Sequence, residues 1–221
     1  MFTGIIQQQG QIEALTSNPS GRRVTLQLSH CSDSLRVGAS LAVNGVCLTI
    51  AEGSCENHLC FDIIPETLRC SNLEVLQVGD LVNIEPPLGV GDALDGHMLS
   101  GHTDGTATLT ERADPSGAGE MILRFSAHPV LTEQMIYKGS VALDGVSMTI
   151  AGLESGSFSV AAIPTTLKLT TLGTLNVAER VNVELDMIGK WVRRIAEPMI
   201  AGVHPHHEDA TVEPNLSKPP R

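Results

Sequence analysis

The sequence has 221 residues, of which 42% are hydrophobic and 18% are charged. This length fits one large domain or two small ones, and the apolar share excludes a chain that is disordered throughout. The formal net charge of −11 argues against a nucleic-acid binder, which usually carries a basic stripe, and against docking on anionic membranes. No stretch reaches the ~20 consecutive apolar residues of a membrane span, so we expect neither nucleic acid nor membrane as a partner.

The first fifteen residues, MFTGIIQQQGQIEAL, lack the basic start and apolar run of a secretory signal. The cysteines all lie in the first third of the chain, are odd in number and show no C-x-x-C spacing: Cys31, Cys47, Cys55, Cys60 and Cys70. Free thiols in a reducing cytoplasm are therefore expected, rather than disulfides or a metal site.

The predicted elements are mainly strands. Residues 23–28 alternate apolar and polar side chains, and residues 40–50 and 81–84 are continuous aliphatic runs. Turn signals between them recur about every 10 residues, which favours a small antiparallel barrel or sandwich. Short helical turns are expected after Pro65 and within 127–137, where Pro129 can open a helix.

The chain contains an internal repeat. LAVNGVCLTIA at 41–51 recurs as VALDGVSMTIA at 141–151, and IPETL at 64–68 recurs as IPTTL at 163–167. VNIE at 82–85 recurs as VNVE at 181–184, and the opening MFTG matches MLSG at 98–101. Two copies of a unit of about 90 residues indicate tandem domains, because a solenoid needs at least three short repeats. We place these domains at residues 1–97 and 98–186, with a Gly- and Pro-rich join at 86–96.

A helix is expected after the second copy, at residues 187–200, and Pro198 should end it. Its apolar residues recur at spacings of three and four: Ile188, Trp191, Val192 and Ile195. This stripe could pack on the barrels or join copies of the chain, and self-association is slightly favoured. Residues 201–221 are polar and Pro-rich and are expected to be disordered, with the histidines at 204, 206 and 207 solvated rather than bound to a metal.

Two exchanges between the copies carry chemical information. Cys47 becomes Ser147 and Asn44 becomes Asp144, while the neighbouring residues are kept. Such exchanges favour a pair of related small-molecule pockets over a duplicated structural barrel. His97 and His102 flank the start of the second copy, and His102, which follows a glycine, is the better candidate for chemistry.

Several catalytic schemes are excluded. The sequence has no G-x-S-x-G elbow, no P-loop, no G-x-G-x-x-G opening a βαβ unit and no zinc-like Cys/His spacing. What remains is a metal-free pocket with Ser, Thr, Cys, His and Asp side chains.

Taken together, MFTGII, the NGVCLTI and DGVSMTI pair, GHMLSGH, YKGS, and the IPETL and IPTTL pair resemble the riboflavin synthase family over residues 1–197. The resemblance implies an all-β fold of two tandem six-stranded Greek-key barrels, each a lumazine-binding domain, with a C-terminal helix that assembles a homotrimer. It implies a transferase of riboflavin biosynthesis that needs no cofactor or metal. A non-catalytic lumazine- or flavin-binding antenna protein is the alternative, and a complex with lumazine synthase stays open.

The implied reaction is a dismutation. Two molecules of 6,7-dimethyl-8-ribityllumazine exchange a four-carbon unit at a site shared by the N-barrel of one subunit and the C-barrel of a neighbour. Riboflavin and 5-amino-6-ribitylaminouracil are the products. The protein mainly needs to align the two rings, with His102 as the candidate for proton transfer and Cys47 or Ser147 adding to, or steering water toward, the acceptor ring.

The resemblance also implies site residues. Those linked to turnover are Phe2, which would offer its ring to the heterocycle, Ser40, Cys47, His102, Thr149 and Asp186. The expected lining of the N-barrel pocket is Gly4, Ile5, Ile6, Cys47, Leu48, Thr49, Asp62, Ile63, Ile64, Pro65, Glu66 and Thr67. The expected lining of the C-barrel pocket is Gly101, His102, Thr103, Lys138, Ser147, Met148, Thr149, Ala162, Ile163, Pro164, Thr165, Thr166 and Leu167.

Overall fold

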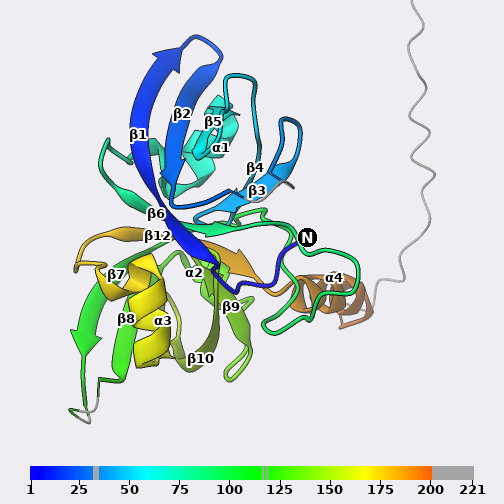
Figure 1. The fold of residues 1–221 in the computed structure, drawn as a ribbon. Coiled ribbons are helices and arrows are strands. Elements are labelled where there is room, and N and C mark those ends of the chain that lie inside the picture. The colour runs from blue at the N-terminus through cyan, green and yellow to red at the C-terminus, as the bar shows by residue number, and fades with distance from the viewer. Residues whose placement is uncertain (32–34, 116, 118, 201–221) are drawn as a thin grey trace, which may run out of the picture.

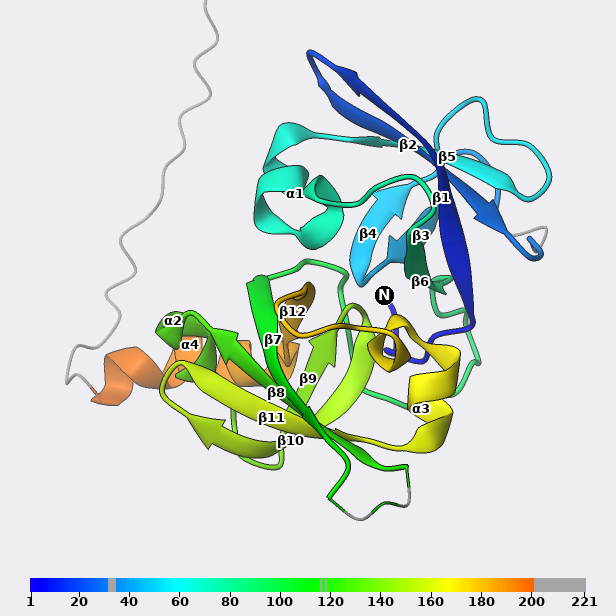
Figure 2. The same ribbon diagram turned by 90° about the vertical axis from the view of Figure 1, so that its left-hand side faces the viewer.

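The computed structural model describes residues 1–31, 35–115, 117 and 119–200. These residues form two β-barrels and a C-terminal helix (Figure 1), and the N-terminus lies between the barrels in both ribbon views (Figure 2). The expected disordered tail and its three histidines lie outside the described residues.

The two barrels contain equivalent elements. The first barrel has β1 (Gln8–Asn18), β2 (Gly21–Leu28), β3 (Ser40–Val43), β4 (Val46–Thr49), β5 (His58–Ile63), α1 (Pro65–Cys70), the 3-10 turn η1 (Asn72–Glu74) and β6 (Leu81–Glu85). The second barrel has β7 (Gly105–Ala113), β8 (Met121–Ala127), α2 (Pro129–Thr132), β9 (Ser140–Leu143), β10 (Val146–Glu154), β11 (Ser157–Ala162), α3 (Pro164–Leu169), the 3-10 turn η2 (Thr171–Gly173) and β12 (Arg180–Leu185). The chain then continues into α4 (Met187–Ile200).

All the strand pairs are antiparallel, and both barrels have the same strand order. The first sheet runs β4-β3-β6-β1-β2-β5, and the second closes through the equivalent order β10-β9-β12-β7-β8-β11. A single bridge between Ile50 and Phe61 joins the two ends of the first sheet, where the second barrel has a ladder that includes Ile150 and Val160. The expectation of two six-stranded Greek-key barrels is confirmed.

Residues 40–50 differ from the prediction of one continuous strand. They form the β3–β4 hairpin, because Asn44 and Gly45 have φ angles of 46° and 75° and make a two-residue turn. Asp144 and Gly145 make the same turn in the second barrel, with φ angles of 46° and 77°. Asn-Gly and Asp-Gly are the preferred sequences for such turns, so the signal was present within the aliphatic run.

Each barrel is filled by its own hydrophobic core. Leu26, Leu41 and Phe61 are fully buried in the first, and Leu109, Val141 and Val160 are fully buried in the second. Protein cores packed in this way leave no room for a heterocycle. A small-molecule ligand must therefore bind outside the barrel walls.

The short helices begin at prolines. The helical turns expected at Pro65 and Pro129 are confirmed as α1 and α2, and α3 starts in the same way at Pro164. A proline fits the first helical turn because its fixed φ is helical and its missing N–H would have no partner there. No helix in the described ranges is long and apolar enough to cross a membrane.

The C-terminal helix α4 is attached to the second barrel by polar contacts. Lys190 Nζ lies 2.8 and 3.0 Å from the two carboxylate oxygens of Asp104, and Arg193 donates to the carbonyl of Glu133. The helix continues to Ile200 rather than ending at Pro198, since proline keeps a helical φ although it lacks the N–H donor. The stripe residues Ile188, Trp191, Val192 and Ile195 are 60–64% exposed.

The barrels meet at their hairpin tips. A Cβ on Gly45 would lie 2.6 Å from the backbone nitrogen of Gly145, and a Cβ on Gly145 would lie 2.8 Å from that of Gly45. Two equivalent buried asparagines then cross the interface. Asn83 Nδ2 donates to the carbonyl of Asp144 at 3.0 Å, and Asn182 Nδ2 donates to the carbonyl of Asn44 at 2.8 Å. These reciprocal contacts relate the barrels by an approximate twofold axis.

We predict that Gly45→Ala destabilises the protein more than the same substitution at a glycine that also has a positive φ but has no close neighbours. Gly38 is the matched control, because its φ is +87° and a Cβ there would meet nothing within 4 Å. Gly38→Ala should lower the free energy of unfolding by about 1–2 kcal/mol from backbone strain alone. Gly45→Ala should lower the free energy of unfolding by a further ~1–3 kcal/mol, because the added methyl group overlaps the backbone of Gly145. Urea unfolding measures both, and equal losses would contradict the tight contact between the barrels.

Candidate active site

In each barrel a buried glutamate near the end of the repeat holds, by hydrogen bonds, the segment at the start of the same repeat. We call residues 1–6 the first strap and residues 98–103 the second strap. The carboxylate of Glu85 accepts from Thr3 N at 2.6 Å, from Thr3 Oγ1 at 2.8 Å and from Gly4 N at 3.0 Å. Glu184 accepts from the equivalent groups of Ser100 and Gly101. Burial raises the pKa of Glu85, and the three hydrogen bonds oppose that shift.

The two straps cross between the barrels. Phe2 and Leu99 exchange backbone hydrogen bonds of 2.8 and 3.0 Å. Beyond this pair, the carbonyl of Gly4 accepts from Ser147 N at 2.9 Å, and the carbonyl of Gly101 accepts from Cys47 N at 2.9 Å. Each strap is therefore held by the glutamate of its own barrel and touches the hairpin of the other.

This crossing corrects the expected grouping of the site residues. Gly4 was expected beside Cys47, but a Cβ on Gly4 would lie 2.6 Å from Ser147 Cβ, and Ile6 packs against the core of the second barrel. Gly101 was expected beside Ser147, but a Cβ there would lie 2.5 Å from Cys47 Cβ. The grouping is wrong because sequence repeats assign each strap to its own copy, whereas the straps are exchanged.

The candidate side chains lie on the outer faces of the hairpins. Cys47 and Thr49 alternate with the core residues Leu48 and Ile50 along β4, so they point away from the barrel interior. Ser40 pairs with Thr49 across the hairpin and shares that face. Ser147, Thr149 and Ser140 repeat the pattern on the second barrel. We call these outer faces, each with the strap that touches it, the Cys47 half-site and the Ser147 half-site.

Four of the expected binding residues turn their side chains into the cores. They are Leu48, Ile63, Met148 and Ala162. Only the backbone of these residues can face a ligand bound on the outer wall. Lys138 is exposed just before β9 and beside the middle of β10, where its N–H donates to the carbonyl of Ile150, and its φ is +65°. The equivalent Gly38 adopts the same conformation without strain.

The Ser147 half-site contains a hydrogen-bonded histidine. His97 Nδ1 lies 2.7 Å from Ser147 Oγ, while His97 Nε2 is buried without a hydrogen-bond partner among the described residues. Burial lowers the pKa of His97 because it disfavours the charged ring, and the charge of Asp186 opposes this shift. In the described part of the chain, the Cys47 thiol has no hydrogen-bonded side chain.

His102 follows Gly101 on the second strap, so it belongs with the Cys47 half-site. Its side chain is exposed, and its N–H donates to Ser100 Oγ at 3.3 Å. This placement groups His102 with Cys47 rather than with the C-barrel residues beside which the resemblance placed it. The equivalent position beside Ser147 is occupied by Ile5, which cannot exchange protons.

Phe2 and Asp186 have local roles that the sequence did not suggest. Phe2 is only 1% exposed and packs with Ala42, Leu99 and Ala142 behind Cys47, so its ring is not free to stack on a heterocycle. Asp186 Oδ1 accepts from Ile188 N at 2.9 Å, and its carbonyl accepts from Lys190 N. Asp186 thus caps the start of α4.

Residues 62–67 and 162–167 lead from a strand end into α1 and α3. At the equivalent corners, Ile64 and Ile163 are 59% and 57% exposed. Asp62 forms an ion pair with Arg23 that lowers its pKa, and Arg69 lowers the pKa of Glu66 to about 2. The second copy has Ala161 and Thr165 at the carboxylate positions. Only the first copy therefore carries fixed negative charge at this rim.

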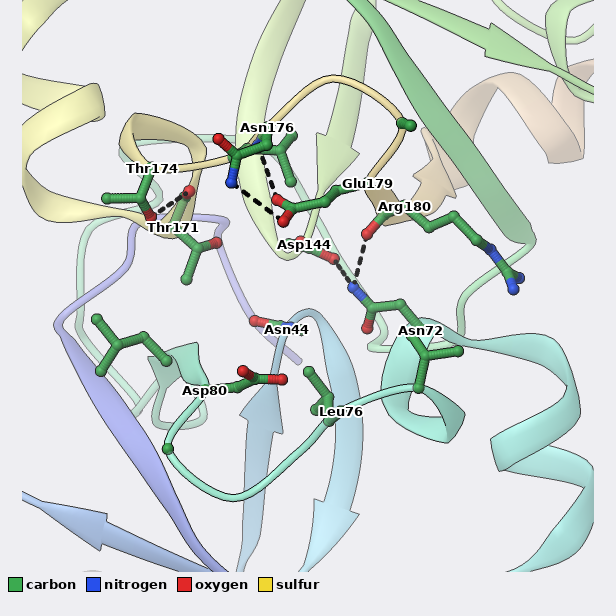
Figure 3. A pocket seen from close by; sticks show the side chains of 15 residues that line it. Asn44, Asn72, Leu76, Asp80, Asp144, Thr171, Thr174, Asn176, Glu179 and Arg180 are labelled. Atoms are coloured by element: carbon green, nitrogen blue, oxygen red, sulfur yellow. Dashed lines mark hydrogen bonds between the residues drawn. The ribbon is translucent and has the colours of Figure 1, made fainter.

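One cavity lies away from the Cys47 and Ser147 hairpin faces. It has a volume of about 680 Å³ and lies between the two barrels, lined by equivalent residues of both copies (Figure 3). None of the expected site residues lines it. A smaller cavity of about 340 Å³ borders Thr3, Ile5 and Glu85. On the two hairpin faces, Thr49 and Thr149 are exposed in the single chain.

Glu85 and Glu184 were not among the sequence candidates, although the sequence held a signal for both, and His97 was placed behind His102 as a candidate. VNIE and VNVE end in a charged residue within otherwise aliphatic strands. A carboxylate kept at a buried strand position in both copies indicates a fixed partner. All five cysteines are free, as expected.

The cavity of Figure 3 contains a carboxyl group with a strongly raised pKa. Asp144 Oδ1 accepts from Asn182 N at 2.7 Å and from Asn72 Nδ2 at 2.9 Å. Complete burial outweighs these hydrogen bonds and raises the pKa of Asp144 from 3.8 to about 7. The exchange of Asn44 for Asp144 thus belongs to the contact between the barrels rather than to a half-site.

We predict that Asp144→Asn stabilises the protein above pH 7. The folded pKa is raised, so the stabilisation from the protonated carboxyl is complete below about pH 4 and is lost as the pH rises to about 7. An amide keeps an oxygen acceptor and removes the charge, so the gain at pH 8 is at most about 4 kcal/mol and disappears at pH 4. Urea unfolding across this range measures it. Asn44→Asp should do the opposite and lower the stability at high pH. A pH profile of stability that Asp144→Asn leaves unchanged would contradict the raised pKa of Asp144.

The comparisons with known proteins agree with this geometry. The family model described as "Lumazine binding domain" matches residues 3–86 and 100–186. A riboflavin synthase of Bacillus amyloliquefaciens is 40% identical over 194 residues, which cover 88% of this chain and 89% of the relative. A riboflavin synthase of Escherichia coli is 37% identical over 187 residues, with coverages of 84% and 87%.

Solved structures of LumP share the fold. The complex of LumP with 6,7-dimethyl-8-(1'-D-ribityl)lumazine has a TM-score of 0.73 at 25% identity, covering 84% of this chain and 99% of that one. The complex of LumP with riboflavin has a TM-score of 0.74 at 27% identity, with the same coverages.

Proposed function

This chain belongs to the riboflavin synthase family, and from that premise we propose that it catalyses the dismutation of 6,7-dimethyl-8-ribityllumazine. One molecule gives a four-carbon unit to a second, and the products are riboflavin and 5-amino-6-ribitylaminouracil. The atoms of the two substrates equal those of the two products, so no further reactant is consumed.

The observation that carries this proposal is the presence of two equivalent half-sites. Both have a strap glycine against a reactive hairpin position, and both straps are fixed by a buried glutamate. A reaction between two identical substrates needs two similar binding surfaces. Holding two rings in a reactive arrangement can supply as much as ~7–11 kcal/mol of the barrier reduction.

We place the lumazines on the outer walls, because the barrel interiors are filled. The backbones of 47–49 and 147–149 can pair with the edge of the ring, and the exposed Thr49 and Thr149 hydroxyls can reach the polar substituents. Lys138 adds a cation just before β9, beside the middle of β10. His102 remains the candidate for proton transfer at the Cys47 half-site.

A complete site requires a second chain. Thr49 and Thr149 are exposed on the two hairpin faces of the single chain, so a ring bound there is covered when another barrel faces it. We propose that the Cys47 half-site of one subunit faces the Ser147 half-site of a neighbour in a homotrimer. The exposed apolar stripe of α4 is the surface that joins the subunits.

A non-catalytic antenna protein is the second candidate, because LumP is among the structural neighbours. A binding protein needs only one ligand surface. Both straps, both glutamates and both hydroxyl-bearing hairpin faces are present here, which supports the enzyme. Titration with riboflavin separates the candidates, since two ligands per chain favour the enzyme and one favours the antenna protein.

We predict that the purified full chain converts the lumazine into riboflavin without added metal or nucleotide. Chromatography should show one riboflavin and one pyrimidine formed for every two lumazines consumed, with EDTA present. Lumazine binding without any riboflavin would contradict the enzymatic function and leave the antenna protein as the better assignment.

We predict that two inactive variants restore each other in mixed trimers. Thr49→Trp blocks the Cys47 half-site and Thr149→Trp blocks the Ser147 half-site, each at an exposed strand position. Co-expression of the two should restore about a quarter of the shared sites, because a site needs an intact face from each of two chains. The same pair truncated after Asp186 should stay inactive. No restoration with full-length chains would place the complete site within one chain.

A further inference from the structure

The two half-sites are alike in shape but differ in how their nucleophiles are supported. Ser147 is hydrogen-bonded to His97, whereas the Cys47 thiol has no such partner among the described residues. A serine hydroxyl is a weak nucleophile unless a base removes its proton, while a thiol needs much less help. The chain therefore provides a base only where its nucleophile needs one.

His97 lies outside the repeated unit, which begins at Met98. Its N–H donates to the carbonyl of Thr3 at 3.0 Å, so the first strap fixes its backbone. Gly96 permits this approach, since a Cβ there would lie 2.1 Å from the carbonyl oxygen of Thr3 and 3.1 Å from Ser147 Cβ. His97 is thus placed by the same strap that touches Ser147.

The environment of His97 suits a proton acceptor. Burial lowers the pKa of His97, which favours the neutral ring, and in the tautomer that carries its proton on Nε2 the Nδ1 atom can accept the Ser147 proton. The charge of Asp186 acts in the opposite direction and stabilises the imidazolium once it forms. Nε2 is buried without a hydrogen-bond partner among the described residues, so Nδ1 is the ring atom that meets the serine.

We infer that His97 is the base that activates Ser147, and that the Ser147 half-site holds the acceptor lumazine. The inference rests on the proposed function. The bond from Ser147 Oγ to a ring carbon of the acceptor forms as the hydroxyl proton passes to His97 Nδ1. The electron pair of the attacked C=N bond moves to the ring nitrogen. His97 returns the proton when Ser147 leaves, so the enzyme is regenerated without another reactant.

The test compares His97→Asn in two backgrounds. In the wild-type background the amide oxygen can still accept from Ser147 but cannot take its proton. We expect kcat to fall about 10²–10⁴-fold, the usual contribution of general base catalysis, while the Kd of the lumazine changes less than about threefold. In the Ser147→Cys background the thiol needs no base, and the loss on adding His97→Asn should shrink to less than about tenfold.

The controls separate chemistry from folding. His30→Asn removes another histidine that is hydrogen-bonded to a serine, Ser29, but lies away from both half-sites, and it should leave turnover unchanged. Equal losses from His97→Asn in both backgrounds, or wild-type kcat in His97→Asn or Ser147→Ala, would overturn the inference. Absence of riboflavin from the wild-type protein would instead refute the proposed function itself.

Discussion

The exchange of straps between the barrels is the constraint on which the rest of the structure depends. Phe2 and Leu99 pair across the approximate twofold axis, and from there each strap reaches the hairpin of the other barrel. Glu85 and Glu184 fix the straps by accepting backbone N–H groups, which a carboxylate does strongly when it is buried. Neither half-site can form from one barrel alone, so the duplication is part of the site and not only of the scaffold.

Symmetry gives the chain two binding faces, and the departures from symmetry give them different chemistry. For the proposed reaction, in which one of two identical molecules donates and the other accepts, such differences can assign the two roles to different sites. The chain differs at the positions that matter: Cys47 against Ser147, and His102 against Ile5 on the straps. The scaffold residues that position them, including the two glutamates and the crossing asparagines Asn83 and Asn182, are the same in both copies.

The repeat and the turn signals were sufficient to predict two small units built of strands, because strand periodicity and turn residues act locally. The choice of barrels came from the family resemblance, and the Asn44-Gly45 turn was missed inside an aliphatic run. The repeat and the turn signals were not sufficient to assign Gly4 and Gly101 to a half-site. A repeat shows which residues are equivalent, but it does not show whether a segment pairs within its own copy or with the other. His97 was undervalued for a related reason, since its partner Ser147 is 50 residues away and the contact depends on the path of the first strap.

The shared axis also makes the two half-sites dependent on each other. Phe2, Leu99, Ala42 and Ala142 form one small cluster behind both hairpins, and Cys47 packs against it. Displacement of the first strap moves Gly4 at Ser147 and, through the Phe2–Leu99 pair, the second strap at Cys47. Both straps and both hairpins therefore share one packed support, and a substitution inside this cluster alters the support of both half-sites.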